Sequence, residues 1–162
     1  MTAAPILEKA FPDTIEPTPA SPWGANPMVA AAQMLRAAAR LPYDASRPDR
    51  WRRSFQQLVG DAAQAVGMYR VPLRQPATAI NFDRADWRRF DRAAARRCKE
   101  HLAIAERVRR LNRRAEQEAI EIHNAVDMME EALALERAVF RCYQKYVDLV
   151  YESYNSEIGG LG

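Results

Sequence analysis

The sequence predicts an all-α protein: a proline-rich extended N-terminal arm, two short helices, and then one very long helix or helical hairpin with coiled-coil-like packing. Three observations predict this class. All ten prolines lie between Pro5 and Pro76. From Ala77 to Ile158 the chain contains neither proline nor glycine, the two residues that disfavour helices most strongly. Across that segment, apolar or small residues recur at intervals of three and four, as on one face of a helix.

Changes in composition divide the chain into segments. Six of the prolines lie in residues 1–27, which predicts an extended or polyproline-like conformation there. The predicted segments are this arm over residues 1–27, two short helices within 28–67, a linker over 68–83, the long helix or hairpin over 84–158, and a glycine-rich tail over 159–162.

The two short helices carry recognisable start signals. Asn26 is a good N-cap residue, and Pro27 suits the first helical position, so a helix is predicted from there to the residues before Pro42. A second helix is predicted to start at Ser46 and to stop at Gly67, because glycine commonly follows a helix end.

The long segment is predicted to begin near Asp83, which can cap a helix. One continuous helix there would be roughly 110 Å long at 1.5 Å per residue. Because no turn residue marks a break, a continuous or once-kinked helix in an oligomer is preferred over a hairpin. If the chain folds back, the turn is expected around Asn112 or around His123 and Asn124, where helix propensity is weakest.

Charge is strongly segregated along this segment. Residues 84–114 hold twelve basic and four acidic residues, whereas residues 115–136 hold seven acidic residues and no lysine or arginine. Such blocks repel when they are parallel and in register, and they attract when antiparallel or staggered. The pattern therefore predicts a hairpin, an antiparallel dimer or a staggered ring of subunits.

Two sets of side chains are candidates for binding partners. The apolar stripe, which Glu136 interrupts, and the aromatic C-terminal run supply the predicted protein-interface residues: Trp87, Phe90, Val108, Leu111, Ile122, Met129, Phe140, Tyr143, Val147, Tyr151 and Tyr154. The arginine-rich half supplies possible contacts to phosphate or to an acidic partner: Arg88, Arg89, Arg92, Arg96, Arg107, Arg110, Arg113 and Arg114.

Catalytic and metal-binding patterns are not recognised. The chain lacks a phosphate-binding glycine-rich loop and a nucleophile-elbow motif. Glu118, Glu121 and His123 lack the Glu-x-x-His spacing of a di-iron helix. Cys98 and Cys142 form no CxxC motif and are expected to be buried apolar residues, able to form a bridge only if the chain folds back. No enzymatic activity, metal or cofactor is therefore expected.

These observations favour a non-enzymatic structural or assembly subunit of a large complex, acting through helical oligomerisation and contacts with other subunits. A bacteriophage virion component, such as an internal, ejection or head–tail protein, is the assembly that is expected by analogy. The alternatives are a phasin-like amphipathic coat protein of a granule or lipid surface and an arginine-rich nucleic-acid-packaging helper. Without a signal peptide or a long apolar segment, a location in the cytoplasm or in a virus particle is expected.

Overall fold

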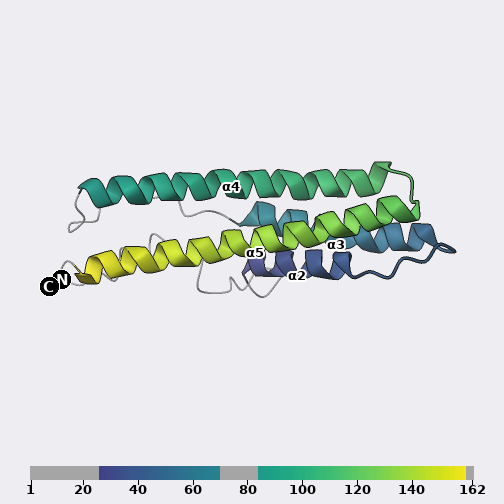
Figure 1. The fold of residues 1–162 in the computed structure, drawn as a ribbon, viewed down its shortest axis with the longest axis horizontal. Helices are drawn as coiled ribbons and strands as arrows, with labels where there is room; N and C mark the ends of the chain where they lie inside the picture. Colours follow the sequence, from purple (N-terminus) through teal and green to yellow (C-terminus); the bar gives the residue numbers. More distant parts are fainter. Residues whose placement is uncertain (1–25, 70–83, 160–162) are drawn as a thin grey trace.

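The computed structural model describes residues 26–69 and 84–159, with side chains described over 26–69 and 88–149. These residues form four helices and no strand: α2 Pro27–Ala39, α3 Pro48–Met68, α4 Arg84–Gln117 and α5 Ile122–Gly159 (Figure 1). The predicted all-α class is confirmed for this part of the chain. Residues 1–25 of the predicted arm, residues 70–83 of the predicted linker and the residues after Gly159 lie outside it, and the coiled-coil-like packing stays a prediction.

The four helices form a bundle in which helices that follow one another in the chain pack together. α2 packs on α3, α3 on α4 and α4 on α5, and α5 packs back on α2. The two long helices run side by side, and α2 and α3 accompany only one half of their length (Figure 1). The largest fully buried side chains come from all four helices: Met28, Leu35, Phe55, Val59, Val66, Val108, Leu111, Met128, Leu135, Val139 and Cys142.

Each short helix begins with a proline. At α2 the Asn26 side chain accepts a hydrogen bond from Met28 N at 2.9 Å, as predicted for an N-cap. At α3 the predicted cap is wrong: Ser46 donates through its hydroxyl to Asp44 at 2.6 Å, and Arg47 stands at the cap position without a side-chain hydrogen bond. Gly67 is not the stop, since α3 continues to Met68.

The preference for one continuous helix over residues 84–158 is wrong, because the chain turns between Gln117 and Ile122 and forms the alternative hairpin. The turn lies just before His123, whereas Asn112 lies inside α4.

Side chains from other segments stabilise this turn, which contains neither glycine nor proline. Asn124 Nδ2 donates to Ala119 O at 2.9 Å, and the Tyr43 hydroxyl donates to Ile120 O at 3.1 Å. The Arg52 guanidinium donates to Glu118 O. The last carbonyl groups of a helix have no partner within the helix, and leaving them without another hydrogen bond is costly. Asn124 lies where the sequence predicts weak helix propensity, whereas Tyr43 and Arg52 supply contacts that no local sequence signal marks.

The charge blocks meet within one chain. Arg107 in the basic block contacts Glu131 in the acidic block at 3.0 Å, from α4 to α5. Lys145 on α5, beyond the acidic block, contacts Glu100 on α4 at 3.4 Å, with the signs of the charges exchanged. The Glu118 carboxylate, with smaller contributions from Asp127 and Glu131, raises the pKa of the Arg114 guanidinium. Because the acidic start of α5 lies beside the basic end of α4, the hairpin satisfies the antiparallel arrangement that the charge pattern predicts.

Candidate functional site

The predicted interface residues fall into three groups in the structure. Val108 and Leu111 lie in the bundle's own core with 0% and 1% of their surface exposed, so a partner cannot contact them. Phe90, Met129, Tyr143 and Val147 are half-buried, and Ile122 and Phe140 are exposed. The side chains of Trp87, Tyr151 and Tyr154 lie outside the described residues.

One row of apolar side chains on α5 faces solvent. We call Ile122, Val126, Leu133 and Phe140 the α5 outer stripe. Ile122, Val126 and Phe140 are 62%, 44% and 44% exposed, and Leu133 is half-buried. Because one residue advances about 100° around a helix, residues seven apart lie nearly in line.

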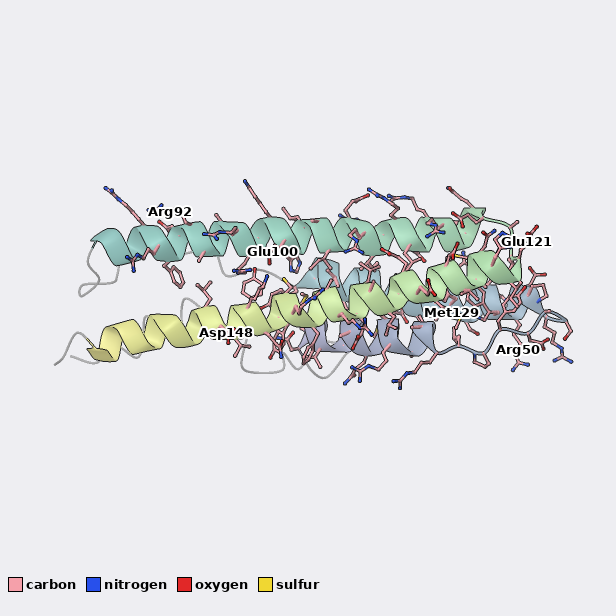
Figure 2. All side chains as sticks on the ribbon, in the orientation of Figure 1. Arg50, Arg92, Glu100, Glu121, Met129 and Asp148 are labelled. Atoms are coloured by element: carbon pink, nitrogen blue, oxygen red, sulfur yellow. The ribbon has the colours of Figure 1, made fainter. Side chains whose placement is uncertain are left out.

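The core-facing side of α5 is a different row, displaced around the helix from the outer stripe. It contains Ala125, Met128, Ala132, Leu135, Val139, Cys142 and Tyr146. α5 therefore has two apolar rows, and the bundle covers only one of them. Figure 2 places Met129, beside the outer stripe, in the half of α5 that α2 and α3 accompany, and Asp148 in the other half.

The arginines of α4 divide into engaged and unengaged residues. Among the eight predicted phosphate contacts, Arg107 pairs with Glu131, Arg113 with Glu106, and Arg114 with Glu118, at 2.8 to 3.0 Å. The other five are exposed and form no ion pair with any described residue: Arg88, Arg89, Arg92, Arg96 and Arg110. Arg92 points away from the hairpin (Figure 2).

Tyr69, His101 and Tyr146 form a buried cluster at the C-terminal end of α3. His101 Nε2 lies 2.9 Å from Val66 O, so the ring donates to one of the last carbonyl groups of α3. The Tyr69 ring stacks on His101 and meets Tyr146 edge-on, with ring centroids 5.6 Å apart in both pairs. Burial raises the pKa of the Tyr69 and Tyr146 hydroxyls. These contacts anchor the end of α3 to the hairpin, and sequence spacing did not reveal them.

The two cysteines lie on the two helices of the hairpin as free thiols, Cys98 half-buried and Cys142 buried. Burial raises the pKa of the Cys142 thiol to about 11. An ordinary thiol has a pKa of about 8.5, so at pH 8 Cys142 holds on the order of a hundredfold less thiolate than an ordinary cysteine.

We therefore expect iodoacetamide at pH 8 to alkylate Cys142 in the folded protein more slowly than Cys98, because Cys142 is only 2% exposed and holds little thiolate, whereas Cys98 is half-buried. Peptide mass mapping over time measures both rates in the same sample. In urea the two rates should become similar, because burial is lost. Equal rates in the folded protein would contradict the burial of Cys142.

In the described ranges 26–69 and 84–159, no group of three or more His, Cys, Asp or Glu residues is placed to hold a metal ion. Glu121 and His123, which the sequence brings close together, lie 3.4 Å apart on the surface and are both 65% exposed. None of the helices over these ranges is both long and apolar enough to cross a membrane.

Comparisons with protein-family models, curated proteins and solved structures find no match to this chain.

Proposed function

We propose that the protein is a non-enzymatic structural subunit that assembles with copies of itself, and that the α5 outer stripe is the surface through which it does so. The observation that carries this proposal is the exposure of Ile122, Val126 and Phe140 in one row on a helix whose other apolar row already packs in the core.

The free energy of burial favours a partner on this row. Single exposed apolar side chains are common on protein surfaces and need no explanation. Several such side chains in one row differ, because a partner helix covers them together, with a gain for each below the roughly 1.5–3 kcal/mol of complete burial, since part of each is already covered. The stripe also belongs to a long helix held by α2 and α4, so binding requires little ordering of the backbone.

That the assembly is a bacteriophage virion stays a prediction from the sequence, and so does the alternative that the protein coats a granule or lipid surface. The nucleic-acid alternative also stays a prediction. It is supported by the five unpaired α4 arginines, whereas the pairing of Arg107, Arg113 and Arg114 with carboxylates reduces the charge available to phosphate.

Making the stripe polar should abolish self-association. We expect the double variant Val126→Gln/Phe140→Gln to weaken association by about 30-fold or more, since two exposed apolar anchors lose their burial in the complex. Sedimentation velocity over a range of protein concentrations measures this, and circular dichroism checks that the variant remains helical.

Leu102→Gln is the matched control. Leu102 is 59% exposed on α4 and does not belong to the α5 outer stripe, so this variant should associate like the unmodified protein. If Leu102→Gln weakened association as much as the stripe variant does, the proposed surface would be wrong. An unmodified protein that sediments as a monomer at every concentration would refute self-assembly.

A further inference from the structure

The α5 outer stripe is nearly symmetrical about Leu133. Val126 and Phe140 lie seven residues before and seven residues after it, which is two helical turns on either side. Two copies of this stripe that run in opposite directions therefore place Val126 of one copy opposite Phe140 of the other. Leu133 then meets Leu133 of the second copy at the centre.

The charged residues beside the stripe are also arranged around Leu133: the acidic ones precede it and the basic ones follow it. Asp127 and Glu130 lie six and three residues before Leu133, and Arg137 and Arg141 lie four and eight residues after it. All four are exposed, and none forms an ion pair with another described residue. At about 100° per residue all four lie on the same flank of the stripe, the flank opposite Glu136.

We propose that two copies of this chain pair through their α5 outer stripes, antiparallel, around a two-fold axis at Leu133. This proposal rests on the proposed function and specifies its partner and register. A two-fold axis brings the same flank of both helices together, so Glu130 faces Arg137 of the second copy and Asp127 faces Arg141 of the second copy. Each pair occurs twice in the dimer, both times on the same side of the apolar row.

A parallel pairing in register has its two-fold axis along the helices, so the flank with these four charges would face the opposite flank of the second copy, which holds Met129 and Glu136. Only the antiparallel arrangement lets Glu130 and Asp127 of one copy face the arginines of the other, so the charge pattern favours it. Contributions of exposed pairs are small, but they suffice to determine direction where the apolar contacts alone do not.

The position of α2 leaves room for this pairing. Arg36 on α2 contacts Glu136, and Tyr43, beyond the end of α2, contacts Ile120. α2 therefore runs antiparallel to α5 and lies mainly beside the residues that follow Leu133. The two-fold axis places the second copy's α2 beside the other half of the interface, so the two α2 helices are offset along α5 and do not compete for the same space.

Charge reversal tests the register. We expect Glu130→Arg alone, and Arg137→Glu alone, each to weaken dimerisation about tenfold in sedimentation equilibrium. The double variant Glu130→Arg/Arg137→Glu should return to within about threefold of the unmodified protein, because the antiparallel pairs are restored with their signs exchanged. Failure of the double variant to recover affinity would overturn the register.

Cysteine linking tests direction independently of charge. Under mild oxidation, Leu133→Cys should form a link between two copies through residue 133, identified by peptide mass. Val126→Cys should not link to itself, because its two copies lie about 21 Å apart along the axis. A mixture of Val126→Cys and Phe140→Cys proteins should link to each other. The unmodified protein, which retains Cys98 and Cys142, is the control.

The outcomes separate this proposal from the proposed function. A link of Val126→Cys to itself, together with loss of association in the stripe variant, would overturn the antiparallel pairing and leave the stripe as the assembly surface. A protein that stays monomeric at all concentrations would overturn both. Links at residue 133 and between residues 126 and 140, with recovery in the charge exchange, support both.

Discussion

Replacing Leu111 with alanine is expected to lower the free energy of unfolding by about 2–5 kcal/mol, whereas the same substitution at Leu102 should change it by less than about 0.5 kcal/mol. Both leucines lie on α4, and both belong to the run of apolar residues at intervals of three and four that the sequence shows over residues 77–158. The bundle buries Leu111 to 1% exposure and leaves Leu102 59% exposed. Alanine at 111 therefore removes core contacts and leaves a cavity, whereas alanine at 102 removes mainly solvated atoms.

Urea unfolding followed by circular dichroism, at one low protein concentration, measures both changes. The shared substitution and the shared helix cancel differences in helix propensity between the two sites. Equal losses at the two leucines would contradict the bundle, because an α4 that packs on another chain along the whole predicted stripe would bury both.

Replacing Arg36 with alanine is expected to lower the free energy of unfolding by about 1–3 kcal/mol, because it leaves a buried carboxylate without its partner. The Glu136 side chain is only 8% exposed and accepts from two nitrogens of Arg36, whose own side chain is 55% exposed. The double variant Arg36→Ala/Glu136→Leu should recover the stability to within about 1 kcal/mol, since an apolar residue suits that position.

A surface ion pair provides the control for Arg36. Arg107 and Glu131 join α4 to α5 at 3.0 Å with side chains 43% and 33% exposed, so Arg107→Ala should cost less than about 1 kcal/mol. The same urea series measures all the variants. If Arg36→Ala cost no more than Arg107→Ala, the buried position of Glu136 would be contradicted.

Local signals in the sequence were sufficient for the fold class and for the start of α2. Absence of proline and glycine predicted the long helical segment, and Asn26 with Pro27 marked a helix start that the structure confirms. The hairpin, with a turn near His123 and Asn124 as one possibility, was only the second choice, because Tyr43 and Arg52, distant in sequence, hold the carbonyl groups of Ile120 and Glu118. No pattern within the long segment reports such contacts.

The row of α5 that packs in the bundle was not identified from the sequence, for a related reason. Helical periodicity finds apolar rows, but it does not tell which row faces the bundle when a helix has two. Both rows contain large apolar side chains, and the core-facing row also contains Ala125 and Ala132, small residues that allow close approach of neighbouring helices. Glu136, which interrupts the predicted stripe, is buried beside Arg36, a partner one hundred positions earlier in the chain.

The central claim is that the exposed row on α5 joins two copies of the chain, and the mass of the full-length protein in solution tests it most directly. Light scattering over a wide range of concentrations should show a mass that rises from 18.4 kDa to about twice that value and then stops, as a closed two-fold pair requires. A mass of 18.4 kDa at every concentration would contradict the claim.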